Sequence, residues 1–201
     1  FIIAEEFLSG EPSALLLGDN LCYGNAFRDL LESADTQQEG ATIFVYNVND
    51  PERYGVVEFD TSGNAISIEE KPKNPKSSFA ITGLYFYDNK VVDYAKQIKP
   101  SYRNELEITD INKIYMEDNK LSVKVMKRGY AWLDTGTHES LLQAHQFVQT
   151  IEHRQGLKIA CPEEVAYNQD WITKEEIKVL AEPMLKNKYG QYLMQVIKES
   201  E

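Results

Sequence analysis

Two aspartates stand where a divalent cation could be held. Asp19 follows the apolar run 14–17, and Asp134 follows the apolar residues 131–133. In open α/β sheets ligands bind at the carboxyl ends of strands, and Mg²⁺ takes carboxylate oxygens together with substrate phosphates. Taken singly, Asp19 is typical of a turn and Asp134 of a helix start. Taken together, the pair predicts one Mg²⁺ site shared between two strands.

A second group of residues carries the charges that a phosphorylated sugar requires. Glu70 and Lys71 close a strand immediately before Pro72, and Arg103 lies in a polar loop before a helical segment. A lysine supplies a point charge to a phosphate, an arginine supplies paired donors, and a glutamate accepts hydrogen bonds from hydroxyls. The alternatives are a solvated charge cluster for Glu70 and Lys71, and an ordinary surface side chain for Arg103.

Two glycines occupy positions where backbone segments or ligands could come close. Gly55 ends the turn 50–55, and Gly83 lies inside the apolar and aromatic run 79–87. A residue without a Cβ permits close approach, and inside a strand it marks a bulge or a close contact. Gly55 is therefore a candidate for the wall of a binding site.

The charge balance excludes one class of partner. The chain has 201 residues, with 21 basic and 32 acidic side chains and a formal charge of −11. Phosphate backbones need clustered Lys and Arg, so no nucleic-acid binding is expected. The apolar runs are far too short to cross a bilayer, so no membrane association is expected either. Small phosphorylated ligands stay open, because a metal can bridge acidic side chains to phosphate.

Cysteine and histidine usage argues against zinc and disulfide chemistry. Cys22 and Cys161 are too few and too isolated for a disulfide framework, which favours a reducing, cytoplasmic setting. His138, His145 and His153 are spaced by seven and eight residues, which does not suit chelation from one helix. The serine-hydrolase elbow and the P-loop signature are both absent.

Strand and helix signals alternate along the first two thirds of the chain. This alternation predicts an α/β fold with a mixed, mainly parallel sheet. Helical periodicity predicts helices at 25–34 and 108–116, and one capped by Asp88. The predicted strands, including a hairpin around 60–64, are 14–17, 41–48, 56–59, 65–68, 79–87 and 121–126.

The last third is mainly helical. Helices are predicted at 137–153, from a capping box of Thr173 and Glu176 to about residue 185, and at 189–197, with a short strand at 157–161. The chain thus divides into an α/β domain, 1–136, and a helical region, 137–201. The apolar surplus of the helical region suits either an interaction surface or a simple packed subdomain.

Six ordered motifs resemble those of the glucose-1-phosphate thymidylyltransferases: LGDN at 17–20, DPERYGVVEF at 50–59, EEKP at 69–72, TGLYFYD at 82–88, ELEITDIN at 105–112 and RGYAWLDTGT at 128–137. The similarity extends from the first residue into the C-terminal helices. It implies a Rossmann-like α/β fold of the nucleotidyltransferase type. Residues 1–136 would be the metal and acceptor half of an incomplete domain, and 137–201 an oligomer and regulatory interface.

The resemblance also implies a role for each candidate residue. Asp19 and Asp134 would bind Mg²⁺, while Lys71 and Arg103 would be catalytic groups that hold the sugar phosphate. The implied reaction joins dTTP and glucose 1-phosphate into dTDP-glucose and pyrophosphate for dTDP-rhamnose synthesis. The residues implied to line the sugar are Tyr54, Gly55, Glu70, Ile81 and Tyr85.

Members of the family are implied to be homotetramers with a second, regulatory nucleotide site at a subunit interface. Tyr23, Gly24 and the segment 161–165 resemble parts of that site. The family's glycine-rich loop (GGxGTRL), the lysine after it and the segment that reads the base have no counterpart in this sequence. The alternatives are therefore a nucleotidyltransferase that uses UTP or CTP, and a non-catalytic sugar-phosphate-binding or assembly module.

We predict that the 201-residue chain alone does not catalyse thymidylyl transfer, because it carries the acceptor and metal residues but not the glycine-rich nucleotide loop. Pyrophosphate release from dTTP and glucose 1-phosphate with Mg²⁺ measures this directly. Turnover by this polypeptide above a no-protein control would contradict the prediction.

Overall fold

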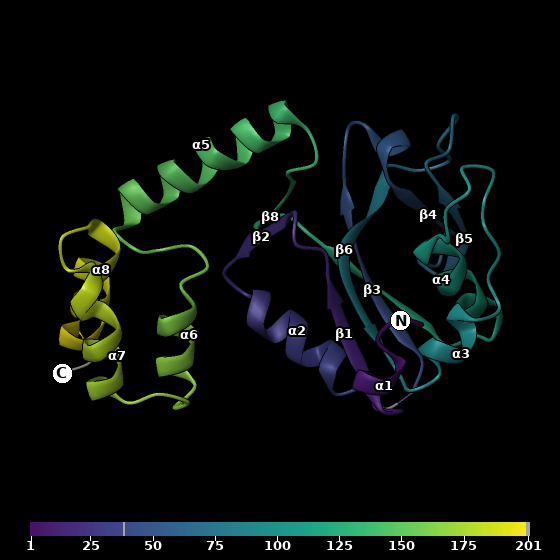
Figure 1. Cartoon of the computed structure of the whole chain (residues 1–201). Helices are drawn as coiled ribbons and strands as arrows, with labels where there is room; N and C mark the ends of the chain where they lie inside the picture. Colours follow the sequence, from purple (N-terminus) through teal and green to yellow (C-terminus); the bar gives the residue numbers. More distant parts are fainter. Residues whose placement is uncertain (38, 200–201) are drawn as a thin grey trace. The chain divides into compact units, whose positions relative to one another are not determined.

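The chain folds into two compact units, Phe1–Thr137 and His138–Glu201. The computed structural model describes residues 1–37 and 39–199 (Figure 1). The sequence places the boundary after residue 136, one residue before the structural one. Each unit has its own buried cluster of apolar side chains and is described by itself.

A six-stranded sheet forms the centre of the first unit. Its order is β5-β4-β6-β3-β7, and β1 pairs with β6 on the side that β4 also occupies. The sequence predicts all six strands, each within a few residues of its observed bounds. These bounds are β1 (Ser13–Leu16), β3 (Ala41–Asn47), β4 (Gly55–Phe59), β5 (Ala65–Glu70), β6 (Phe79–Tyr87) and β7 (Leu121–Met126).

The sheet is mixed as expected, but its pairing is not mainly parallel. Among the described residues the β3–β7 ladder is the parallel one, and every other ladder of the sheet is antiparallel. The physical reason is the position of β6. Strands β1, β3 and β4 run in one direction, but β6 runs against them and lies between them, so each of them pairs with an antiparallel neighbour.

Helices cover both faces of this sheet (Figure 1). The alternation along β3 shows why, because Ile43 and Val45 enter one apolar cluster and Phe44 enters another. The first cluster includes side chains of α3 (Val91–Ala95) and α4 (Ile108–Glu117), and the second includes side chains of α2 (Phe27–Asp35). A four-residue helix, α1 (Glu5–Leu8), precedes β1.

A two-stranded ribbon completes the first unit. It pairs β2 (Asn20–Gly24) with β8 (Tyr130–Asp134) in antiparallel register, so that Asn20 lies opposite Asp134 and Gly24 opposite Tyr130. A Cβ on Gly24 would lie 2.4 Å from Cδ1 of Tyr130, so only glycine fits beside this ring. The ribbon brings two segments that are more than a hundred residues apart into one register.

The second unit contains four α-helices among its described residues. The capping box is confirmed, because the Thr173 hydroxyl accepts from the Glu176 N–H while the Glu176 carboxylate accepts from the Thr173 N–H. None of the helices described in the chain combines the length and apolarity needed to cross a bilayer. The helices are α5 (His138–Gln155), α6 (Pro162–Asn168), α7 (Lys174–Ala181) and α8 (Lys188–Glu199), with 3₁₀ turn η2 (Glu182–Met184) after α7.

The predicted strand at 157–161 is wrong. No strand forms there; instead Glu152 of α5 accepts a hydrogen bond from the Ile159 N–H and pairs with Lys158. The physical reason is that the described part of this unit contains no strand with which these residues could exchange backbone hydrogen bonds. Residues 157–161 therefore form a loop that leads into α6, a helix that the sequence pattern did not indicate.

A buried carboxylate ties three elements of the first unit together. The Asp88 side chain accepts hydrogen bonds from the Gly40 N–H (2.7 Å), the Tyr115 hydroxyl (2.6 Å) and the Lys90 N–H (3.0 Å). The sequence expects Asp88 to cap a helix, but the N-cap residue of α3 is Lys90, without a side-chain cap, because the helix begins only at Val91. Asp88 lies two residues before this N-cap and accepts from its N–H. The two further bonds join this corner to the start of β3 and to α4.

We predict that Asp88→Ala lowers the free energy of unfolding by about 3 kcal/mol, because it leaves a buried N–H and a buried hydroxyl without a partner. Urea unfolding followed by circular dichroism measures the loss. The matched control is Asp93→Ala, an exposed aspartate in the first turn of α3. Equal losses in the two variants would contradict the buried network.

Candidate active site

An open cleft of about 540 Å³ lies in the first unit, at the ends of the sheet strands and the β2–β8 ribbon. Its wall gathers residues from sequence segments that are far apart. The lining residues are Leu17, Asp19, Asn20, Arg53, Tyr54, Gly55, Glu70, Lys71, Ile81, Gly83, Tyr85, Ile108, Thr109, Trp132, Asp134, Gly136 and Thr137.

The two predicted metal ligands meet in this cleft. Asp19 is in the turn between β1 and β2, and Asp134 is the last residue of β8. The carbonyl of Asp19 accepts hydrogen bonds from the N–H (2.8 Å) and hydroxyl (3.0 Å) of Thr135, which joins the two strand ends. A Cβ on Gly136 would lie 3.4 Å from Oδ2 of Asp134 and 3.8 Å from Oδ2 of Asp19. Both carboxylates therefore border the same small space.

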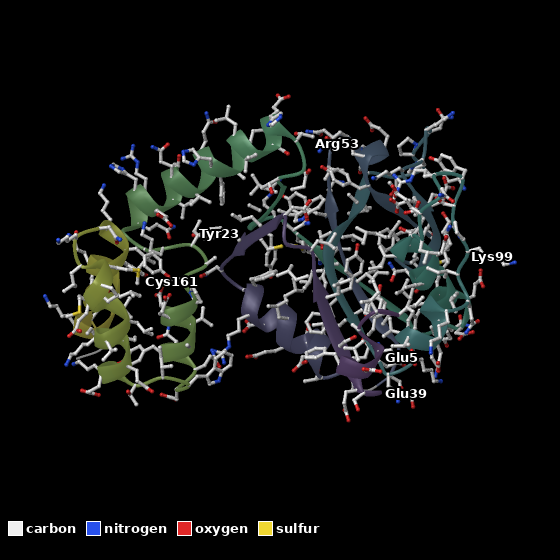
Figure 2. All side chains as sticks on the ribbon, viewed as in Figure 1. Glu5, Tyr23, Glu39, Arg53, Lys99 and Cys161 are labelled. Carbon is white, nitrogen blue, oxygen red and sulfur yellow. The ribbon has the colours of Figure 1, made fainter. Side chains whose placement is uncertain are left out.

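The Asp134 carboxylate is hydrogen-bonded by two side chains of the first unit, one of them positively charged. The Tyr54 hydroxyl donates to its Oδ1 at 2.8 Å, and Nη2 of Arg53 donates to its Oδ2 at 2.9 Å. Arg53 is on the 3₁₀ turn η1 (Pro51–Arg53) between β3 and β4, and it is labelled in Figure 2. Burial raises the pKa of Tyr54 well above its usual value, and the hydrogen bond to Asp134 raises it further. Tyr54 is thus a neutral donor at any physiological pH.

Asn20 and Gly83 shape the opposite side of this space. Asn20 donates to Oδ1 of Asp19 at 2.8 Å and accepts from the indole of Trp132 at 2.7 Å. A Cβ on Gly83 would lie 2.6 Å from the Asn20 amide nitrogen, so the turn can cross β6 only over a glycine. The β3–β6 register also shifts at this point, between the pairs of Ile43 and Val45. The expectation of a bulge or a close contact at Gly83 is confirmed on both counts.

A carboxylate on β5 forms a second part of the wall. Glu70 lies opposite Gly55 in the β4–β5 ladder, and its Oε2 accepts a hydrogen bond from the buried Thr109 hydroxyl. A Cβ on Gly55 would contact Thr109 at 3.1 Å, Glu70 at 3.2 Å and Ile81 at 3.2 Å. The glycine therefore keeps open the space in front of the Glu70 carboxylate.

Lys71 adopts a strained backbone conformation at the edge of the cleft. Its φ is 42°, in the left-handed region that side-chain-bearing residues seldom adopt, and it precedes Pro72. Its N–H donates to the Tyr54 carbonyl at 3.0 Å, which holds the turn in place. Strain of roughly 1–3 kcal/mol persists only where the surroundings impose it, and such positions cluster at functional sites.

Arg103 stands beside the cleft rather than in its wall. Its Nε and Nη2 donate to Glu107 at 3.0 Å each, and Nη2 also donates to Glu105 at 2.6 Å. Nη2 lies 3.9 Å from Oε1 of Glu70, which does line the cleft. Burial alone would raise the pKa of Glu107, but hydrogen bonds from Arg103 and Ser101 lower it below its ordinary value. The ion pair with Glu107 therefore holds the guanidinium firmly in position.

The cleft contains nine of the residues that the sequence and the resemblance single out: Asp19, Tyr54, Gly55, Glu70, Lys71, Ile81, Gly83, Tyr85 and Asp134. Tyr23 and Gly24 are on β2 outside its lining, and Cys161, in the other unit, precedes α6. Sequence reasoning missed the roles of Arg53 and Thr109. Arg53 adjoins Tyr54 and so stood inside a recognised motif, but nothing in the pattern showed that it reaches Asp134.

The donor set suits a hard divalent cation with open positions. Two carboxylates face one space, and the described residues, 1–37 and 39–199, contain no group of three or more Asp, Glu, His or Cys side chains arranged to hold a metal. Mg²⁺ is commonly bound by one or two carboxylates, and water and substrate phosphates complete its coordination. The residues present fit such an ion better than a zinc ion enclosed by protein ligands.

Comparison with known proteins identifies the class. The model of the nucleotidyl transferase family matches residues 1–151. A solved UDP-glucose pyrophosphorylase in complex with UDP-glucose has the same fold, with a TM-score of 0.63 at 20% identity over 74% of this chain and 60% of that one. The chain is therefore a nucleotidyltransferase by its family model, and the predicted α/β fold of the nucleotidyltransferase type is confirmed apart from the strand directions.

Closer relatives define the family. A glucose-1-phosphate thymidylyltransferase of Neisseria meningitidis is 55% identical over 99% of this chain and 69% of its own length. That of Mycobacterium tuberculosis is 46% identical over 100% of this chain and 69% of its own. A crystal structure described under the same enzyme name, from Bacillus anthracis with sucrose, has a TM-score of 0.64 at 43% identity, covering 72% of this chain and 57% of that one. The chain belongs to the glucose-1-phosphate thymidylyltransferase family.

Proposed function

We propose that this cleft binds glucose 1-phosphate and supports its reaction with dTTP to give dTDP-glucose and pyrophosphate. The observation that carries the proposal is the meeting of Asp19 and Asp134 in one cleft with Glu70 and Lys71. This arrangement offers oxygen ligands to a cation, an acceptor to sugar hydroxyls and a positive charge to a phosphate. The family membership supplies the nucleotide and the sugar.

The reaction requires positioning and charge neutralisation more than a covalent nucleophile. A phosphate oxygen of glucose 1-phosphate attacks the α-phosphorus of dTTP, a new P–O bond forms, and the bond from the α-phosphorus to the bridging oxygen breaks to release pyrophosphate. Asp19 and Asp134 would hold Mg²⁺, which when bound neutralises phosphate charge. The residues of the cleft then orient the sugar phosphate towards the nucleotide.

Different side chains would bind the two ends of the sugar phosphate. The Glu70 carboxylate, anchored by Thr109, is placed to accept from sugar hydroxyls in the space that Gly55 leaves open. Lys71 would hold the phosphate, since it lines the cleft and carries a positive charge. Arg103 would contribute from beside the cleft, where Glu107 fixes the guanidinium.

The quaternary and cellular settings belong to the same proposal. The tetramer, and the regulatory site that would include Tyr23 and Gly24, follow from the resemblance to the family. A reducing, cytoplasmic location is supported by Cys22 and Cys161, which are both free thiols. Burial raises the pKa of the Cys22 thiol to about 11, so this thiol is unreactive at neutral pH.

Calorimetry of the 201-residue chain tests the acceptor site. We predict that Lys71→Gln weakens glucose 1-phosphate binding about tenfold, because a charge-assisted contact to phosphate contributes roughly 1.5 kcal/mol or more. The matched control, Lys73→Gln, removes an exposed lysine two residues away that is outside the cleft lining. Equal affinities for the parent and Lys71→Gln would remove Lys71 from the phosphate site.

Calorimetry with nucleotides separates this proposal from its alternatives, and it uses a full-length protein that contains this segment. Binding of glucose 1-phosphate without binding of dTTP, UTP or CTP would indicate a non-catalytic sugar-phosphate module. Turnover of a full-length protein with UTP or CTP in preference to dTTP would indicate another nucleotide.

Asp134 is the sharper test of catalysis. In a full-length protein that contains this segment, we predict that Asp134→Asn abolishes turnover and leaves the fold intact, because the amide cannot balance the charge of a divalent cation. Steady-state rates with Mg²⁺ and a circular dichroism spectrum measure the two parts. A normal rate would exclude Asp134 from the metal site.

A further inference from the structure

Arg53 occupies the place beside Asp134 where a cation is needed. Its guanidinium makes two ion pairs, through Nη2 to Oδ2 of Asp134 at 2.9 Å and through Nη1 to Oδ2 of Asp50 at 2.8 Å. It also lies 5.1 Å from the centroid of the Tyr54 ring. Since the Tyr54 hydroxyl holds Oδ1 of Asp134, both oxygens of this carboxylate are already engaged.

The Arg53–Asp134 pair is well placed to be exchanged. The Arg53 side chain is 36% exposed, against 18% for Asp134, so water reaches the guanidinium. A guanidinium that water reaches can leave one carboxylate without becoming a buried, uncompensated charge. Asp50, 43% exposed, lies on the other side of the guanidinium and would keep Arg53 in place after the first pair opens.

Building on the proposed function, we propose that Arg53 is the resident counter-ion of Asp134 and competes with the divalent cation for Oδ2 of that carboxylate. Nη2 of Arg53 would leave Asp134 when a cation is bound there, and Nη1 would remain on Asp50. Two cations cannot share one oxygen at close range without strong repulsion. The competition lowers the intrinsic affinity of the site for a free metal ion, and Arg53 is a positioning residue that sets this affinity.

The test is the affinity of the 201-residue chain for Mn²⁺, measured by electron paramagnetic resonance of the free ion. Arg53→Gln is expected to bind Mn²⁺ about tenfold more tightly, because a positive charge that competes for the Asp134 carboxylate is removed. Arg53→Lys keeps the charge and is expected to stay within about twofold of the parent. The matched control is Arg28→Gln, which removes an exposed, ion-paired arginine on α2 outside the cleft lining.

Each outcome decides the matter. Unchanged or weaker Mn²⁺ binding by Arg53→Gln overturns the proposal, and so does an equal gain in Arg28→Gln, which would indicate a general charge effect. Loss of Mn²⁺ binding in Asp134→Asn supports the metal site, independently of the result for Arg53→Gln. Mn²⁺ binding that survives in Asp134→Asn refutes the metal site itself, and this inference with it.

A second measurement follows Arg53 in the parent chain itself. In the ¹⁵N-labelled parent chain, Mg²⁺ is expected to shift the Arg53 side-chain N–H resonance, assigned with Arg53→Lys, and to leave that of Arg28 unchanged. An Arg53 resonance that does not respond while Mg²⁺ saturates the site overturns the proposal.

Discussion

The site depends on one constraint, which is that two carboxylates are brought to the same space and their charges must be balanced. The register of the β2–β8 ladder places Asn20 opposite Asp134, and the bonds from Thr135 to the Asp19 carbonyl close the end of this ribbon. Like charges at close range are costly unless cations or donors face them. Arg53 and Tyr54 face Asp134, and Asn20 faces Asp19, so the site is stable before any ligand enters.

A similar arrangement surrounds Glu70 in the same cleft. Glu70 is held by Thr109 and has Arg103 3.9 Å away, while Arg103 is itself held by Glu105 and Glu107. Glu70, like Asp19 and Asp134, is thus oriented by hydrogen bonds from neighbours in the cleft wall. Such preorganisation suits a reaction between two anions, in which the protein contributes position and charge balance more than bond-making groups.

Much of the fold could be read from local pattern because local pattern reflects which face of an element is buried. The apolar run before Asp19, the β-branched run of β3 and the capping box at Thr173 all predict their elements correctly. The sheet direction could not be read in this way, since apolar alternation looks the same in parallel and antiparallel strands. The strand predicted at 157–161 failed for a related reason, because a strand needs a partner that no local pattern reveals.

By itself the sequence determined the candidate chemistry: the two aspartates, the Glu70–Lys71 pair at a strand end, and the glycines that permit close approach. Its motifs also determined the family. Only the tertiary structure decided which of these groups meet. In the structure Arg53 and Thr109 line the cleft, and Arg103 lies beside it. The physical reason is that residue type and spacing specify what a side chain can do, whereas ladder register and close backbone packing specify what it can reach.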